Sequence, residues 1–266
     1  MRKIVVAIPT LNEEKHILRA IEYAKKITET IYVFDSGSID QTEQLVKENN
    51  IPFIKLPKEF SFAEKMNYIY EYETFRNCLV FRIDADEIIT KKNRDIIVET
   101  LKNSDSDFYI LTRKLSFMGK KLSFGRTALP SLRIALCGSI FYEKVDLDER
   151  IIPIKNEYKI KKINAYIIDK PNTSFSEWIN KHNKYSDLEA LMFYKTANKR
   201  KLKKSLFVKL YYFLPPIIRP FLFFIFRYIF CLGFLDGLKG LLFQLSHSII
   251  YRLIVDIKIL LFFLDK

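Results

Sequence analysis

Two carboxylates one residue apart, Asp84 and Asp86, follow an apolar run that begins at Cys78. In a β-strand, residues i and i+2 point to the same side, so both carboxylates can face one ligand. Hard oxygen ligands suit Mg²⁺ or Mn²⁺, and magnesium sites often combine one or two carboxylates with substrate phosphates. The pattern predicts a divalent cation at a strand end; a solvated turn is the alternative for such a pair.

The elements that would position these carboxylates read as strands and helices in alternation. Continuous apolar runs at 3–9, 31–34, 51–54 and 78–83 predict buried strands. Between the first two, apolar residues recur at helical spacing, namely Ile17, Ala20, Ile21, Ala24 and Ile27. Strands alternating with helices predict an α/β fold with a doubly wound, mostly parallel sheet.

Three helix starts are predicted from capping patterns. Asn12 can cap the first helix, with acidic residues in its first turn. Ser38 to Gln41 and Ser61 to Glu64 both fit the capping-box pattern. We therefore expect helices to begin just after these three residues.

Three of the predicted strands end in short segments that contain polar residues. These segments are Pro9-Thr10, Asp35-Ser36 and Asp84-Ala85-Asp86. Open α/β sheets bind ligands outside the carboxyl ends of their strands, so these residues are expected on one ligand-binding edge.

The N-terminal 90 residues resemble an inverting family-2 glycosyltransferase of the GT-A type. The matching motifs are Ile8-Pro9-Thr10-Leu11-Asn12-Glu13-Glu14, Asp35-Ser36-Gly37-Ser38-Ile39-Asp40-Gln41-Thr42 and Asp84-Ala85-Asp86-Glu87. Ile39 stands where the family usually has Thr. The three motifs are specific together because their order and spacing also match.

Later motifs are similar to a subgroup that builds bacterial surface polysaccharides or lipopolysaccharide core. They are Phe117-Met118-Gly119-Lys120, Leu132-Arg133, Tyr142-Glu143, Asp148-Glu149, the run from Trp178 to Tyr185, Glu189-Ala190, Phe226-Arg227-Tyr228 and Gly233-Phe234-Leu235-Asp236-Gly237. Arg150 stands where the subgroup often has His, which leaves the acceptor side open.

The resemblance implies a nucleotide-sugar donor, for which we favour UDP, and Mn²⁺ or Mg²⁺ as cofactor. Asp86 would hold the cation with Asp84 nearby, and the cation would offset charge on the departing diphosphate. The implied donor contacts are Pro9, Leu11, Glu13, Asp35, Lys65, Asp84 and Ala85. Asp35 has an alternative as a turn-forming residue before Gly37, and Lys65 as a solvated helix lysine.

An inverting transferase needs a base on the acceptor hydroxyl. The resemblance places the Asp148-Glu149 pair at the acceptor, and we choose Asp148 as base while leaving Glu149 open. One predicted helical face offers a further acceptor or diphosphate contact, with packing as its alternative; its members are Trp178, Lys181, His182 and Tyr185.

Charge divides the chain into a predicted catalytic domain, 1–194, and a basic tail, 195–266. The whole chain carries +13, and the tail holds 13 Lys/Arg against three Asp, a net +10, among many aromatic residues. This composition favours amphipathic helices that lie on an anionic membrane surface, with packing on protein as the alternative. No signal peptide pattern is present, and three sparse cysteines fit a reducing compartment.

We therefore expect a peripheral enzyme on the cytoplasmic face of the inner or plasma membrane. It would transfer a sugar to a glycan or glycolipid acceptor that is lipid-linked or part of a surface polysaccharide, without a nucleic-acid partner; homo-oligomerisation is left open. A polyprenyl-phosphate glycosyltransferase is the nearest alternative. A non-enzymatic membrane or nucleic-acid-binding protein would explain the basic tail, but not the carboxylates at successive strand ends.

Overall fold

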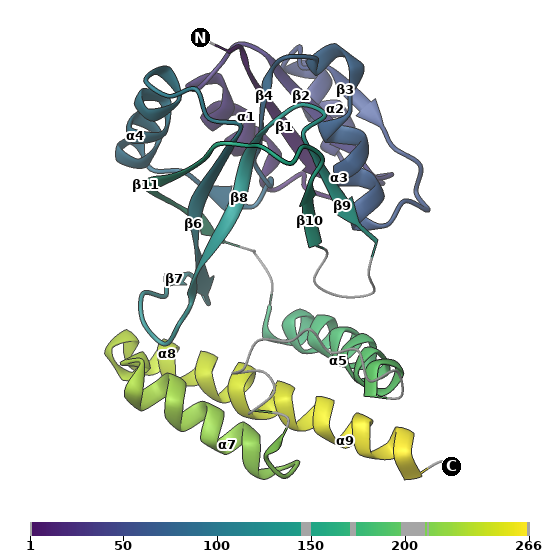
Figure 1. Ribbon diagram of the computed structural model, residues 1–266, viewed down its shortest axis with the longest axis vertical. Helices are drawn as coiled ribbons and strands as arrows, with labels where there is room; N and C mark the ends of the chain where they lie inside the picture. Colours follow the sequence, from purple (N-terminus) through teal and green to yellow (C-terminus); the bar gives the residue numbers. More distant parts are fainter. Residues whose placement is uncertain (1, 145–149, 171–173, 198–210, 212, 265–266) are drawn as a thin grey trace. The chain divides into compact units, whose positions relative to one another are not determined.

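The computed structural model describes residues 2–144, 150–170, 174–197, 211 and 213–264 (Figure 1). By packing, the chain divides into one unit of residues 1–114 and 129–171 and another of residues 115–128 and 172–266. The predicted boundary at residue 194 falls inside a helix, α5 (Phe175–Ala197), which packs along α9 (Tyr251–Leu264) in the second unit. The hairpin segment 115–128 also belongs to the helical unit, although sequence composition did not separate it from its neighbours.

The first unit is built on a mixed sheet. Among the described residues the strand order is β3-β2-β1-β4-β8-β6-β11-β5. Its four parallel strands are β1 (Ile4–Thr10), β2 (Ile31–Asp35), β3 (Phe53–Lys55) and β4 (Leu79–Arg82). The other strands in that order are β5 (Glu87–Ile88), β6 (Phe108–Phe117), β8 (Ala128–Leu136) and β11 (Ile160–Asp169). β7 (Lys120–Lys121) pairs with β6 in the hairpin, and β9 (Ile140–Glu143) and β10 (Arg150–Pro153) form a separate two-stranded sheet. The predicted α/β fold with a mostly parallel sheet flanked by helices is confirmed.

Helices cover both faces of the parallel strands, as the uninterrupted apolar runs predict. They are α1 (Ile17–Lys25), α2 (Thr42–Glu48), α3 (Phe62–Tyr70) and α4 (Lys91–Lys102). On β1, Val6 and Ile8 pack into one buried cluster with α1, α2 and α4. Val5 and Ala7 point the other way and pack with α3. Alternate residues of one strand therefore serve two cores, which fixes the register of the strand and the place of its polar end.

The capping predictions had different outcomes. Ser61 forms the predicted capping box at α3, with its hydroxyl accepting from Glu64 N and the Glu64 carboxylate accepting from Ser61 N. Asn12 does not cap a helix, because α1 begins only at Ile17. Ser38 does not cap α2, which begins at Thr42. Both of those predictions are wrong.

Hydrogen bonds between two loops explain the two wrong predictions. Asn12 donates from its backbone N–H to Ser38 Oγ at 2.8 Å, and its side-chain Oδ1 accepts from Ile39 N at 2.9 Å. The two side chains that local spacing assigned to helix starts instead join the loops that follow β1 and β2.

The second unit is helical. Its described helices are α5, α7 (Ile218–Ile225), α8 (Gly237–Gln244) and α9, with π-helical turns at Phe226–Phe230 and Leu245–Ile250 and a 3-10 turn at Gly233–Asp236. In Figure 1, α7 lies beside the helical stretch formed by α8 and α9, and a 74° bend of the chain separates the two.

The hairpin around β7 is fastened to these helices by buried polar contacts. The Asp236 carboxylate accepts hydrogen bonds from Ser123 N and Phe124 N at 3.0–3.1 Å. Arg227 Nε donates to the Gly125 carbonyl at 2.9 Å. Gly125 has φ +67°, and a Cβ there would lie 2.2 Å from Gln244 Nε2, so the close approach requires glycine.

Within the described part of the chain, no single helix is both long and apolar enough to cross a membrane. One bent pair, Ile218–Phe230 with Gly233–Leu264, meets the length and composition limits together across a 74° bend.

Candidate active site

The Asp84-Ala85-Asp86 segment forms a closed turn at the end of β4. Asp84 N donates to Glu87 Oε2 at 3.0 Å, and Glu87 N donates to the Asp84 carbonyl at 2.9 Å. Glu87 then enters β5, where it pairs with Asp169 of β11. Ala85 is buried in the core, so only its backbone is available to a ligand. The turn is therefore bound on both sides to the sheet.

The Asp84 carboxylate is held by two buried arginines. Arg133 Nη1 lies 2.9 Å from Asp84 Oδ2, and Arg82 Nε lies 3.2 Å from Asp84 Oδ1. Burial raises the pKa of Asp84, but the two guanidinium groups outweigh burial and lower the pKa to about 2. Asp84 is therefore ionised at neutral pH, and its charge is already balanced by the protein.

Arg133 connects this turn to β8. Its side chain is fully buried, and its second guanidinium nitrogen pairs with the buried Glu87 carboxylate. One planar guanidinium thus binds two carboxylates of the same turn. The sequence identified Arg133 only as part of a family motif. Its contact with Asp84 was not predicted, because no local pattern relates the two residues.

Among the described residues, no arginine or lysine forms an ion pair with the Asp86 carboxylate; Arg19 Nη2 donates to the Asp86 backbone carbonyl at 3.4 Å. The Asp86 carboxylate is largely buried, and its pKa rises to about 6 through burial first and then through the negative charges of Asp169, Asp84 and Glu13. Glu13 lies in the loop after β1, where its carboxylate is 2.8 Å from His16 Nδ1. Asp86 therefore lies in an excess of negative charge that a ligand cation would relieve.

Asp169 was missed by sequence reasoning. It ends the strand β11, and the carbonyl of Asp86 accepts from Lys170 N at 3.2 Å, which holds the two strand ends together. Arg113 on β6 lies 3.8 Å from Asp169. The available signal was an apolar run at 165–168 that ends in a carboxylate, the same pattern that identified Asp84.

The donor set fits a cation shared with a substrate, not an all-protein metal site. Among the described residues, no group of three or more His, Cys, Asp or Glu side chains is arranged to hold a metal ion. Magnesium bound through phosphates needs only one or two protein carboxylates. Asp86 meets that requirement, whereas Asp84 is occupied by its arginines.

Asp35 closes β2 with both carboxylate oxygens in use. Oδ2 accepts from Gly37 N and Ser38 N at 2.8 Å each, and Oδ1 accepts from the Thr10 and Ser38 hydroxyls. The turn-forming alternative thus describes its contacts in this structure. A role in binding the base stays a prediction.

The other predicted donor contacts lie around the same loops. Pro9 is the penultimate residue of β1 and lies beside Phe34, and Leu11 is exposed in the loop that follows. Lys65 of α3 is partly buried; burial lowers its pKa, and the Asp35 carboxylate opposes that change. Lys65 is therefore near the end of β2, and it is not a fully solvated helix lysine.

The predicted face on α5 divides into packed and exposed residues. Trp178 stacks on His182 at 3.7 Å between ring centroids, and His182 packs edge-on against Tyr251. Burial lowers the pKa of His182. Lys181 and Tyr185 are exposed. Trp178 and His182 therefore pack against neighbouring side chains. A contact of any of the four residues with an acceptor or diphosphate stays a prediction.

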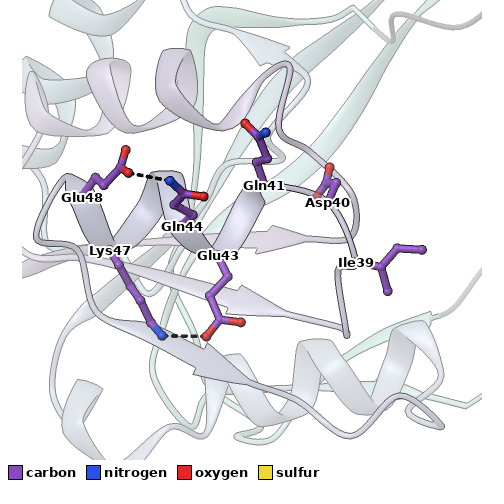
Figure 2. A pocket seen from close by; sticks show the side chains of 7 residues that line it. All are labelled: Ile39, Asp40, Gln41, Glu43, Gln44, Lys47 and Glu48. Atoms are coloured by element: carbon purple, nitrogen blue, oxygen red, sulfur yellow. Dashed lines mark hydrogen bonds and ion pairs between the residues drawn. The ribbon is translucent and has the colours of Figure 1, made fainter.

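The predicted bases Asp148 and Glu149 lie outside the described residues. A shallow hollow of about 610 Å³ is present on the outer side of α2, lined by Ile39, Asp40, Gln41, Glu43, Gln44, Lys47 and Glu48 (Figure 2). It contains none of the predicted site residues.

Comparisons with known proteins identify relatives of this chain. Residues 5–176 match the family model described as Glycosyl transferase family 2. An uncharacterized glycosyltransferase of Rickettsia typhi is 34% identical over 115 residues, which cover 41% of this chain and 37% of that protein. One from Rickettsia prowazekii is 33% identical over 115 residues, with the same coverage. The matched region thus spans little more than a third of these relatives.

Among solved structures, similarity is found to a glucosyl-3-phosphoglycerate synthase from Mycobacterium tuberculosis in complex with Mn²⁺, UDP and glucosyl-3-phosphoglycerate. Its TM-score is 0.35 at 23% identity, over 44% of this chain and 45% of that one. A second structure of that synthase, with Mg²⁺ and UDP, also has a TM-score of 0.35 at 23% identity, covering 44% of each chain. Likeness at this level carries no conclusion about what the present chain binds.

Replacing Arg133 should destabilise the fold. We expect Arg133→Met to lower the free energy of unfolding by about 3–5 kcal/mol, because two buried carboxylates lose their cation. Arg133→Met/Glu87→Gln should recover part of the loss. Urea denaturation measures both, with Lys47→Met, an exposed ion-pair partner, as a control expected within about 1 kcal/mol. Equal losses for Arg133→Met and Lys47→Met would contradict this account.

Asp86→Asn should stabilise the metal-free protein. The wild-type carboxylate, with its pKa raised from 3.8 to about 6, is ionised at pH 7 at a cost to the folded state. A pKa unit corresponds to about 1.4 kcal/mol, so we expect a gain of about 1–3 kcal/mol at pH 7, allowing for partial solvent contact.

The gain should shrink as pH falls from 6 to 4, because the folded wild type then takes up a proton that the unfolded chain does not bind. Denaturation at several pH values tests this, with exposed Asp95→Asn as the matched control. Added Mn²⁺ should stabilise wild type and leave Asp86→Asn unchanged. A destabilised Asp86→Asn at pH 7 would show that the carboxylate makes a structural contact instead.

Proposed function

Because this chain belongs to glycosyl transferase family 2, we propose that it transfers a sugar from a nucleotide-sugar, with a divalent cation at Asp86, to a lipid-linked or surface-polysaccharide acceptor. The single observation that supports the metal assignment is the burial and raised pKa of the Asp86 carboxylate. This carboxylate is largely buried with carboxylate neighbours, and its pKa is raised to about 6. Perturbed pKa values of this kind cluster at functional sites.

When bound, Mn²⁺ or Mg²⁺ supplies Lewis-acid stabilisation of the diphosphate that leaves the sugar. The residues of the chain hold and orient the groups that bind the nucleotide. Arg82 and Arg133 hold Asp84 ionised and fixed, so its carboxylate can orient a ribose hydroxyl without a change of protonation. Lys65, near Asp35, carries a positive charge toward the predicted nucleotide edge.

The acceptor hydroxyl attacks the sugar carbon as its bond to the diphosphate breaks, and a carboxylate takes the hydroxyl proton. We assign this step to Asp148, with Glu149 as the alternative. The later motifs support a membrane glycolipid or surface-polysaccharide acceptor, and we place the enzyme on the cytoplasmic side of the membrane. There, soluble nucleotide-sugars meet lipid-linked acceptors.

Transfer should require the cation and Asp86. UDP-, GDP-, CMP- and dTDP-sugars are each incubated with the full chain and Mn²⁺, and released nucleotide is measured. We expect one donor class to give turnover that EDTA abolishes and fresh Mn²⁺ or Mg²⁺ restores, and Asp86→Ala to be inactive. Asp95→Ala is the matched control and should keep wild-type turnover. Full activity in EDTA would overturn the metal assignment, and a chain inactive with every donor and acceptor would overturn the transfer reaction.

Comparing a glycan acceptor with polyprenyl phosphate decides the acceptor class. Asp148→Asn should lower kcat by roughly 10²–10⁴-fold with a hydroxyl acceptor, the range for loss of a general base. Nucleotide affinity, measured by calorimetry, should stay unchanged. Should Glu149→Gln be inactive and Asp148→Asn active, Glu149 is the base. Should only polyprenyl phosphate accept sugar, with both variants active, no base is needed and the polyprenyl-phosphate reaction replaces the proposed one.

A further inference from the structure

Two segments of the helical unit, 115–128 and 213–264, sort their charges by sign, whereas α5 of the same unit exposes the acidic Glu177 and Asp187. Within residues 115–128 and 213–264 only two acidic residues occur, Asp236 and Asp256, and both are buried. Four basic residues of the same segments are exposed: Lys120, Lys121, Arg126 and Lys239. The exposed charge of these two segments is therefore entirely positive.

The interior of the same segments is unusually polar. Arg219 Nε donates to both oxygens of Asp256 at 2.9 Å, and this ion pair is almost fully buried. Arg227 Nη1 donates to Ser248 Oγ at 3.2 Å, and Ser248 Oγ donates to Gln244 Oε1 at 3.1 Å. Buried ion pairs give little net stability in a water-soluble fold. In a membrane environment, charged groups characteristically face the interior and pair with one another.

Large apolar side chains are exposed along these helices, and six of them lie within residues 229–238. This segment contains the 74° bend between α7 and α8 (Figure 1). We call this set the apolar bend; its exposed members are Ile229, Phe230, Leu232, Phe234, Leu235 and Leu238. Phe230 is 74% exposed and Leu238 71% exposed. Six exposed apolar side chains within ten residues of the chain are a concentration of the kind that marks a contact surface.

Two of the exposed basic residues, Lys120 and Lys239, lie beside this bend. Lys239 Nζ donates to the Met118 carbonyl at 2.7 Å, and Lys120 Nζ pairs with the Asp236 carbonyl, so the hairpin and the start of α8 carry their charges together. Met118 at the hairpin tip is itself exposed. Apolar residues flanked by cations, without exposed carboxylates, match the chemistry of an anionic lipid surface.

We propose that the apolar bend inserts into the interfacial region of an anionic bilayer, with Lys120, Lys121, Arg126 and Lys239 against the lipid headgroups. The bend supplies apolar contact with the acyl boundary, and the cations supply attraction to phosphate. The Arg219–Asp256 ion pair and the hydrogen bonds from Arg227 through Ser248 to Gln244 satisfy polar groups inside the unit that lipid could not satisfy. This membrane contact stands independently of the proposed sugar transfer, because it uses none of the residues of the β4 turn.

The experiment is co-sedimentation of the full chain with vesicles of phosphatidylcholine, with and without phosphatidylglycerol. We expect binding to the anionic vesicles, weakened by salt through screening. Phe230→Ser/Leu238→Ser should reduce that binding by roughly tenfold or more, since two large side chains no longer leave water. Ile39→Ser is the matched control because Ile39 is 88% exposed in the other unit, and it should bind as wild type does.

A conservative variant keeps the test independent of folding. Phe230→Trp adds an indole at the bend, and vesicles with brominated acyl chains should quench its fluorescence beyond the quenching of wild-type Trp178. The proposal is overturned if the double serine variant binds like wild type, or if the added indole is not quenched. It is also overturned if wild type ignores both vesicles and light scattering shows a dimer that Phe230→Ser/Leu238→Ser converts to monomer; the bend would then be a protein interface.

Discussion

Compensation of buried charge at the end of β4 is the constraint on which the candidate site depends. Three carboxylates occur within four residues, Asp84, Asp86 and Glu87, and a low-dielectric interior cannot hold them unpaired. Arg133 takes two of them, and Arg82 adds a second cation at Asp84. Among the described residues, no arginine pairs with the Asp86 carboxylate, although Arg19 donates to its backbone carbonyl. The turn thus neutralises two of its carboxylates with arginine and leaves the third in a field of negative charge.

This arrangement also separates two functions that the Asp-x-Asp pattern joins. The prediction that both carboxylates face one side of a strand is wrong, because β4 ends at Arg82 and they lie in the turn that follows. Their surroundings move their pKa values in opposite directions, to about 2 for Asp84 and about 6 for Asp86. Paired carboxylates whose environments differ in this way typically take different parts in a reaction. The structure thereby favours Asp84 as an orienting group and Asp86 as the metal ligand.

In the helical unit, residues of the later family motifs contact one another. Lys120 of one motif pairs with Asp236 of another, and Arg227 of a third binds the hairpin at Gly125. Gly233 also lies against this assembly, since a Cβ at Gly125 would be 3.3 Å from the Gly233 Cα. Motifs more than 100 residues apart therefore form one polar cluster that fastens a hairpin to helices. Their spacing along the chain shows none of this.

Local patterns were sufficient wherever both partners of an interaction lie within one turn or one strand. The apolar runs predicted the parallel strands and their polar ends. The spacing of Ser61 and Glu64 predicted their capping box, because the two residues are three positions apart. Ser38 had an equally good local pattern, but its hydroxyl is used by Asp35 and by Asn12 of another loop. Tertiary structure alone decided that Arg133, 49 residues from Asp84, neutralises it, and that Asp169 stands near Asp86. The physical reason is that periodicity specifies which side a residue faces, whereas charge compensation depends on which distant strand the sheet places beside it.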